Sequence, residues 1–126
     1  MTIDAIGLGL CTVDMHFVVD RQPTFDTTIR ASQYLRQGGG PVPTSLVALS
    51  RLGASTSYVG KVGDVPDGDF IRAELEKVGV YTSSFVVVPG ALTLLVLALV
   101  DKVTVHRGLS TLPQPSPHLY PPALHL

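Results

Sequence analysis

Segments with strand-like and helix-like patterns alternate along the first 88 residues of the chain. Apolar, β-rich runs cover residues 3–13, 56–62 and 81–88, and runs with apolar residues at helical spacing cover residues 44–52 and 69–78 between them. The connections between these runs are short. Because this order is typical of parallel strands joined by right-handed crossovers, we predict an α/β fold.

The composition agrees with that fold class. Apolar residues make up 45% of the 126 residues, aromatic residues only 6%, and tryptophan is absent. The apolar content is therefore mostly Val, Leu and Ala, as expected of buried strands covered by helices. The length fits one small domain.

Charge and cysteine content exclude some partners and compartments. The net charge of −1 lacks the basic excess of proteins that bind nucleic acids or anionic membranes, so we expect neither partner. The longest apolar run, residues 91–100, is about half of the roughly 20 residues of a membrane-spanning helix and is interpreted as a strand. The single cysteine, Cys11, lies in an apolar run, and we expect a buried thiol in a cytoplasmic protein.

Two further regions have β-like patterns outside this alternation. Residues 15–36 have the pattern of a hairpin or ribbon, and residues 92–100 and 103–106 form two more β-like runs. We expect these regions to form a separate small β layer. Half of the prolines lie beyond residue 111, and because proline lacks a backbone donor we expect an irregular end there.

Several familiar site patterns are incomplete. Gly7 and Gly9 begin like a dinucleotide-binding fingerprint, but the third glycine and the following helix are missing. Gly60-Lys61 is not a Walker phosphate loop, because the glycine spacing differs and Val62 stands where Ser or Thr is required. The histidines show no metal-binding spacing, so we predict no metal site; they are His16, His106, His118 and His125.

Asp14 and the three glycines 38–40 are the candidate binding residues. Asp14 follows the first predicted strand, and ligands of open α/β sheets bind at the carboxyl ends of parallel strands. A carboxylate there can accept hydrogen bonds from two sugar hydroxyls, or the residue can simply begin a turn. The glycines precede a helix N-terminus and allow a ligand to approach backbone N–H groups, or they form a flexible hinge. Both alternatives stay open on the residues alone.

Four segments together resemble the N-terminal signature of the PfkB, or ribokinase-like, carbohydrate kinases. They are GGPVPTSLVALSRLG at residues 39–53, YVGKVGD at 58–64, GDFI at 68–71 and LEKVGV at 75–80. The resemblance covers about residues 3–108. It is specific, because several glycines, a helix and two strands recur in the family's order and spacing.

The resemblance implies a ribokinase-like parallel sheet with flanking helices and a small β-sheet lid. Such kinases transfer the γ-phosphoryl group of ATP, with Mg²⁺, to a hydroxyl of a sugar or nucleoside. By the same resemblance, residues 15–36 and 92–106 supply lid strands, which often also form a dimer contact, so a homodimer is expected. Asp14 then binds sugar hydroxyls, and the backbone of Gly39 and Gly40 lines the same pocket.

Two positions depart from the family pattern. Thr44 stands where the first motif usually carries a sugar-binding Asn, and Val65 stands where an Asp is common. Thr44 offers one hydroxyl in place of an amide. We keep Thr44 as a candidate substrate-binding residue with altered contacts, and ribose, fructose, hexose phosphates and nucleosides all stay open as substrates.

The family's late motif, Asp-Thr-x-Gly-Ala-Gly-Asp, has no counterpart in the sequence. That motif carries the catalytic aspartate and the anion hole, so we assign no catalytic residue. We predict a truncated, N-terminal part of a kinase domain at residues 1–108 and an irregular tail at 109–126. Without the nucleotide site it is expected to be inactive alone. The alternatives are a non-catalytic sugar-binding or dimerisation module and an unrelated α/β binding protein.

Overall fold

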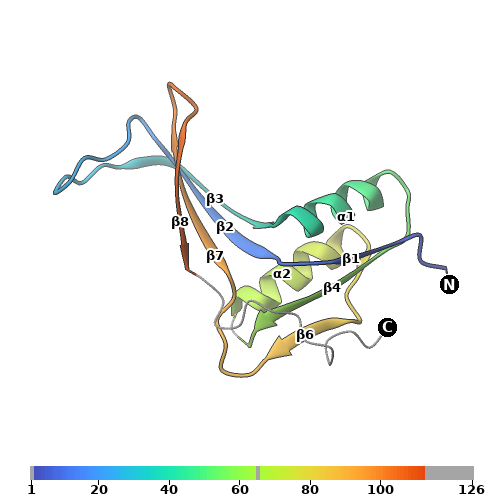
Figure 1. The fold of residues 1–126 in the computed structure, drawn as a ribbon. Coiled ribbons are helices and arrows are strands. Elements are labelled where there is room, and N and C mark those ends of the chain that lie inside the picture. The colour runs from blue at the N-terminus through green and yellow to red at the C-terminus, as the bar shows by residue number, and fades with distance from the viewer. Residues whose placement is uncertain (1, 65, 113–126) are drawn as a thin grey trace.

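The fold consists of two sheets and two helices. A computed structural model describes residues 2–64 and 66–112 of the chain (Figure 1). Within them, the strands are β1 (Ala5–Leu8), β2 (Thr12–Val19), β3 (Ala31–Gly39), β4 (Thr56–Gly63), β5 (Val80–Tyr81), β6 (Phe85–Val88), β7 (Leu95–Asp101) and β8 (Arg107–Leu112), and the helices are α1 (Pro41–Arg51) and α2 (Pro66–Lys77).

The first sheet is parallel throughout and confirms the predicted α/β fold. Its strands run in the order β1-β4-β5, and β6 pairs with the second half of β4. Both helices pack against this sheet, α1 mainly on β1 and β4 and α2 on β5 and β4, and α2 also contacts β3 and β2 of the second sheet. Sequence order and spatial order therefore agree in the strand–helix–strand–helix–strand region.

The core lies between this sheet and the two helices. Tyr58 and Val62 of β4 pack with Leu46 of α1 and with Ile71 and Leu75 of α2, and all five side chains are buried. Burying one such aliphatic side chain contributes about 2 kcal/mol to folding. The predicted helices therefore form because each has an apolar stripe that the sheet covers.

Gly7 and Gly9 allow α1 to approach β1 closely. A Cβ at Gly7 would lie 2.6 Å from a methyl group of Val42, and a Cβ at Gly9 would lie 2.5 Å from another methyl group of the same residue. Real Cβ atoms do not pack at such distances. The two glycines that only partly matched a dinucleotide fingerprint thus serve helix–strand packing.

The second sheet has the strand order β3-β2-β7-β8. β2 and β3 form an antiparallel hairpin, β2 and β7 are parallel, and β7 and β8 are antiparallel. Figure 1 shows this sheet extending away from the part of the molecule that the helices cover. The prediction of a separate β layer built from two distant regions is confirmed.

The single first strand predicted over residues 3–13 is wrong. β1 ends at Leu8, and β2 starts at Thr12 in the second sheet. Asp14 therefore lies within β2 and does not follow a parallel strand. Glycines at 7 and 9 make the backbone pliable at this point, and the apolar run conceals the change of sheet.

Two other segments also differ from the prediction. Gly38 and Gly39 belong to β3 and only Gly40 connects it to α1, so the expected glycine loop is mostly strand. The third strand, predicted over 81–88, is divided into β5 and β6, which pair with different halves of β4.

The end of the chain differs as well. Residues 103–106 form a turn rather than a strand, and β8 follows it, continuing four residues past residue 108. The rest of the expected tail, residues 113–126, lies outside the described residues.

The two helices in the described part of the chain lack the combination of length and apolar character that is needed to span a membrane.

Candidate functional site

Asp14 and Gly39 lie in contact where the second sheet meets α1. Asp14 is on β2, and Gly39 is the last residue of β3, opposite Thr12. A Cβ at Gly39 would fall on Oδ2 of Asp14 and within 2.7 Å of the Thr12 hydroxyl. Only glycine leaves room for the carboxylate at this place.

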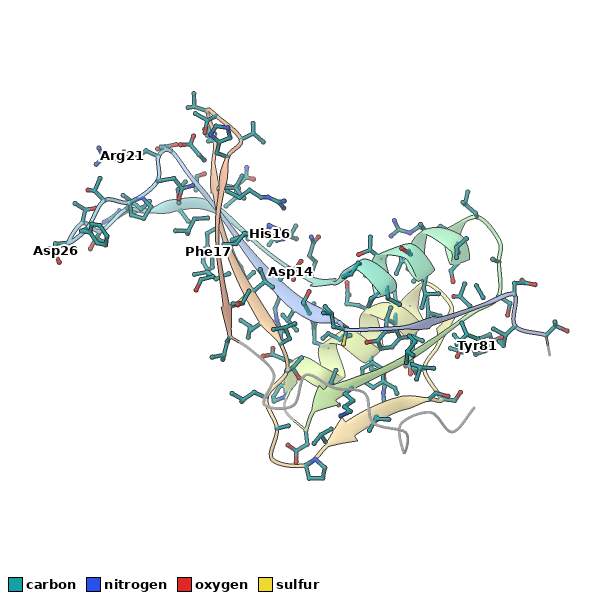
Figure 2. All side chains as sticks on the ribbon, in the orientation of Figure 1. Asp14, His16, Phe17, Arg21, Asp26 and Tyr81 are labelled. Carbon is teal, nitrogen blue, oxygen red and sulfur yellow. The ribbon has the colours of Figure 1, made fainter. Side chains whose placement is uncertain are left out.

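The Asp14 carboxylate is held by its neighbour. The Thr12 hydroxyl donates a hydrogen bond to Oδ1 of Asp14 over 2.5 Å. Thr12 is itself buried, whereas Asp14 is only half-buried, so the carboxylate is fixed at one oxygen and reachable from outside. Figure 2 shows Asp14 on the part of β2 that lies nearest the start of α1.

Gly40 makes the turn from β3 into α1. Its φ of 103° lies in the region that favours glycine, and a Cβ there would be 2.7 Å from the Leu10 carbonyl oxygen. The helix starts at Pro41, three residues before the predicted start at 44, and has a second proline at 43, because proline is tolerated in a first turn. Because proline has no N–H, this helix end offers few donors to an anion, which favours an uncharged ligand.

Thr44 lies apart from the Asp14 carboxylate. Its N–H donates to the Gly40 carbonyl over 3.1 Å, which is the first hydrogen bond of the helix. Its side chain lines a cavity of about 300 Å³ between α1 and α2, to which Gly38 and Gly39 also contribute but Asp14 does not. The structure thus brings Asp14, Gly39 and Gly40 together and places Thr44 on the neighbouring cavity.

A groove with both polar and apolar lining residues lies along the second sheet beyond Asp14. Gln37 is directly opposite Asp14, and Nε2 of Gln37 lies 3.3 Å from Nε2 of His16. These two residues line a groove of about 600 Å³ with Gln33, Tyr34 and neighbouring aliphatic residues. Sequence analysis missed the groove, although the two-residue period from Asp14 to His16 places both on one face of a strand.

Arg36 joins the second sheet to the helix layer. Its guanidinium forms an ion pair with Asp67 and lies 4.0 Å from the centre of the Phe70 ring, both on α2. Arg36 is adjacent to Gln37 on β3 and therefore points to the other face of the sheet. No sequence motif indicated this contact, because its partners are some thirty residues away in the chain.

Cys11 and Tyr58 are buried beneath this site. Burial raises the pKa of the Cys11 thiol, which confirms the prediction of a buried cysteine, and a raised thiol pKa makes a poor nucleophile. Burial also raises the pKa of Tyr58, whose hydroxyl donates to the Gly9 carbonyl over 2.7 Å. Both groups support the backbone between β1 and β2.

The described residues do not fit a Mg²⁺ site. Among residues 2–64 and 66–112, no three His, Cys, Asp or Glu side chains come together in a way that could hold a metal ion. Mg²⁺ binds through carboxylates together with substrate phosphates.

Comparison with known proteins shows similarity to longer sugar kinases. The chain is 33% identical over 84 residues to 5-dehydro-2-deoxygluconokinase of Halalkalibacterium halodurans, which covers 67% of this chain and 24% of that protein. It is 35% identical over 75 residues to ribokinase of Bacillus subtilis, covering 60% of this chain and 26% of that one. The chain thus spans about a quarter of the length of these curated relatives.

The fold is also found in solved structures. The ribokinase of Arabidopsis thaliana, solved with ribose and ATP, matches with a TM-score of 0.77 at 19% identity over 89% of this chain and 36% of that one. This match confirms the predicted ribokinase-like fold.

The sequence profile of the pfkB family carbohydrate kinases matches residues 4–124. The match extends past residue 108, up to which the quoted motifs resemble the family. Because the profile covers almost all of its 126 residues, the chain belongs to the pfkB family of carbohydrate kinases.

Proposed function

We propose that this chain supplies the sugar-binding crevice and lid of a carbohydrate kinase. The observation that carries the proposal is the contact between Asp14 and Gly39, beside the Gly40 turn into α1. In this arrangement a half-buried carboxylate occupies the space that a side chain at Gly39 would fill. Such a surface suits a ligand with adjacent hydroxyl groups.

Each residue has a defined part in the proposed site. The Asp14 carboxylate accepts hydrogen bonds from two sugar hydroxyls, while the Thr12 hydroxyl holds its Oδ1 in place. Gly39 leaves room for this carboxylate, and Gly40 turns the backbone into α1 beside it. Thr44 lines the neighbouring cavity and contacts the ligand only from that side.

Phosphoryl transfer requires groups that we do not find on this chain. The sequence contains no Asp-Thr-x-Gly-Ala-Gly-Asp motif, and the described residues form no metal site. Without a base and an anion hole, positioning and charge stabilisation at the γ-phosphate are lost. We therefore propose that the chain alone binds sugar but neither binds ATP with Mg²⁺ nor transfers phosphate.

A titration of the full chain tests this proposal. Ribose and fructose are titrated by calorimetry into the wild type, Asp14→Asn and the control Asp20→Asn, an exposed carboxylate at the end of the same strand. Hydrogen bonds to a charged group contribute about 1.5–3 kcal/mol, so Asp14→Asn should weaken binding roughly tenfold or more. Equal affinity in all three proteins contradicts the site, and ADP release from ATP above background contradicts the predicted inactivity.

A dimer through the lid is a second proposal, favoured by the exposed edges of the second sheet. All residues of the edge strand β8 are exposed, including Leu109 and Leu112, and unpaired strand edges readily pair with another chain. Sedimentation equilibrium tests it: a defined dimer is expected, and a monomer at all concentrations contradicts it.

We also propose a cytoplasmic location for the chain. A reduced Cys11 and a substrate drawn from the sugars of the cell both agree with this location.

A further inference from the structure

The second sheet is joined to the rest of the fold by three backbone connections. Residues 9–11 link β1 to β2, Gly40 links β3 to α1, and residues 89–94 link β6 to β7 (Figure 1). The first two connections are short and contain Gly9 and Gly40, and glycine restricts the backbone less than any other residue. Side-chain contacts are therefore needed to fix the angle between the second sheet and the helices.

Arg36 on β3 makes such a contact with two residues of α2. Its guanidinium forms an ion pair with the Asp67 carboxylate and lies 4.0 Å from the centre of the Phe70 ring. Asp67 and Phe70 are three residues apart on α2, so they lie on the same side of the helix. A guanidinium donates hydrogen bonds from its edge and stacks on an aromatic ring with its face. Arg36 is therefore held at two points on one helix.

The ion pair between Arg36 and Asp67 is partly open to water. The two side chains are 35% and 29% exposed. Dissolved ions screen the attraction between charges that water reaches, so salt weakens a pair of this kind. The strength of the contact between the second sheet and α2 therefore depends on ionic strength.

Arg36 lies near the proposed sugar site but faces away from it. It precedes Gly39 by three residues on β3, about 10 Å along the strand, and is opposite Met15, the neighbour of Asp14 on β2. Because adjacent residues of a strand project to opposite faces, Arg36 and Asp14 lie on different faces of the second sheet. Arg36 can act on a sugar at Asp14 only through the position of the sheet.

The proposed sugar site has one side on each of the two parts that Arg36 joins. Asp14 and Gly39 belong to the second sheet, whereas Thr44 lines the neighbouring cavity from α1. A rotation of the second sheet away from the helices keeps Asp14 and Gly39 together but moves both of them relative to α1. A ligand held from both sides then loses the contacts on one of them.

We propose that Arg36 is a positioning residue for the sugar site, because its contacts with Asp67 and Phe70 hold the second sheet at the angle at which Asp14 and α1 face one ligand. This inference rests on the proposed sugar site. It has a consequence that the sugar site alone does not have. The affinity for an uncharged sugar should fall as salt is added, although the sugar forms no ion pair of its own.

Calorimetric titration of ribose and fructose into the full chain at about 0.01 M and about 1 M salt tests the inference, because the screening length falls from about 30 Å to about 3 Å. Arg36→Leu should weaken binding at low salt about fivefold, as expected for a partly exposed ion pair together with a cation–π contact, and should remove the salt dependence. The double variant Arg36→Asp with Asp67→Arg should restore most of both.

Arg72→Leu is the matched control for the loss of an arginine. Arg72 also lies on α2 and over an aromatic ring, 4.9 Å from the centre of Phe85, but Phe85 is on β6 of the first sheet. This contact does not reach the second sheet. Arg72→Leu should therefore leave both the sugar affinity and its salt dependence as they are in the wild type.

A distance measurement follows the position of the second sheet without any ligand. Spin labels are attached at Ala48→Cys on α1 and Ser110→Cys on β8, which are both exposed, while the buried Cys11 stays unlabelled. Electron resonance should show a narrow distribution of distances in the otherwise wild-type chain and a broader one with Arg36→Leu. The charge exchange should narrow the distribution again.

The outcomes separate this inference from the proposed function. If the wild type binds sugar and Arg36→Leu binds it equally well, or Arg72→Leu weakens binding as much, the inference is overturned and the sugar site stands. If the wild type binds neither sugar, the sugar site is wrong, and the distances alone decide whether Arg36 fixes the sheet: an unchanged distribution in Arg36→Leu overturns it. Urea denaturation checks that each variant folds, and Asp67→Asn replaces Arg36→Leu if that variant does not.

Discussion

Adjacent glycines at the candidate site are required for different physical reasons. Gly39 is buried at the end of β3, where the missing Cβ leaves space for the Asp14 carboxylate. Gly40 has a φ of 103° and lies against the Leu10 carbonyl oxygen. Gly39 is therefore required for the ligand site, and Gly40 is required for the turn of the backbone from β3 into α1.

Alanine at these two positions should therefore have separable effects. Gly39→Ala pushes the Asp14 carboxylate aside and should reduce sugar affinity about tenfold or more, as Asp14→Asn does. Gly40→Ala forces a non-glycine residue into a strained conformation and should lower the free energy of unfolding by about 1–3 kcal/mol. Urea denaturation and calorimetry on both variants distinguish them. If the free energy of unfolding falls equally in both variants, the two glycines do not have separate roles.

Val105 holds an unfavourable backbone conformation in the β7–β8 turn. Its φ is 61°, which is rare for a β-branched residue, and its side chain is exposed. Val105→Gly should raise the free energy of unfolding by about 1 kcal/mol, because the strain disappears and no packing is lost. Asp26→Gly is the matched control: Asp26 has a φ of 57°, but aspartate tolerates this region better, so a smaller gain is expected. A gain at Asp26 larger than at Val105 would argue against strain as the cause.

At the scale of elements, the turn between β7 and β8 is organised by one carboxylate. Oδ1 of Asp101 accepts hydrogen bonds from the N–H groups of Val103 and Thr104 over 2.9 and 3.0 Å. The N–H of Thr104 and then that of Val103 lower the pKa of Asp101, because they stabilise its charged form. This local chemistry explains why residues 103–106 turn although their composition favours a strand.

The contribution of Asp101 should depend on pH in a defined direction. Because its folded-state pKa is lowered, its stabilisation is complete above the unfolded value of about 3.9 and is lost as the pH falls through the lower folded value. Asp101→Ala should therefore be less stable than the wild type near neutral pH, and the difference should shrink below about pH 4. Thermal unfolding across this pH range measures it. A difference that stays constant to the lowest pH would rule out the carboxylate as its source.

At the scale of the whole molecule, one face of the first sheet carries exposed apolar side chains. Gly7 and Gly9 face α1, so Ile6, Leu8 and Leu10 project to the opposite side, where they are 55%, 48% and 50% exposed. Tyr81 lies on the same face, in register with Ile6 through Ser57, and is 41% exposed. Contiguous apolar patches of this kind are sites of association.

The isolated chain should therefore self-associate through this face. Ile6→Lys and Leu8→Lys together should raise the concentration at which light scattering detects oligomers, because they place charge on the edge strand β1 without touching the helix-covered core. Leu52→Lys provides the control, because Leu52 is 84% exposed just after α1 and outside this face. Equal improvement from the control substitution would show a general effect of charge.

Much of the first sheet was predictable because its signals are local. The helix at α1 follows from its prolines, its apolar spacing and Gly53, and β4 follows from an uninterrupted β-rich run. Asp14, Gly39 and Gly40 are candidate site residues from the sequence, and the structure places the Asp14 carboxylate against Gly39. The groove at His16 was missed because it depends on the pairing of β2 with β3 and on β7, which is some eighty residues further along the chain.

The sequence by itself determined the α/β class, the family, the helices and the residues of the candidate site. Apolar periodicity, proline and glycine act within a few residues, and motif spacing is read directly from the chain. Only the tertiary structure decided that residues 3–13 divide between two sheets, that Thr44 lines a cavity to which Asp14 does not contribute, and that Arg36 joins the second sheet to α2. Those features are set by strand pairing and packing between distant segments, and a local pattern carries no record of which distant partner a strand will pair with.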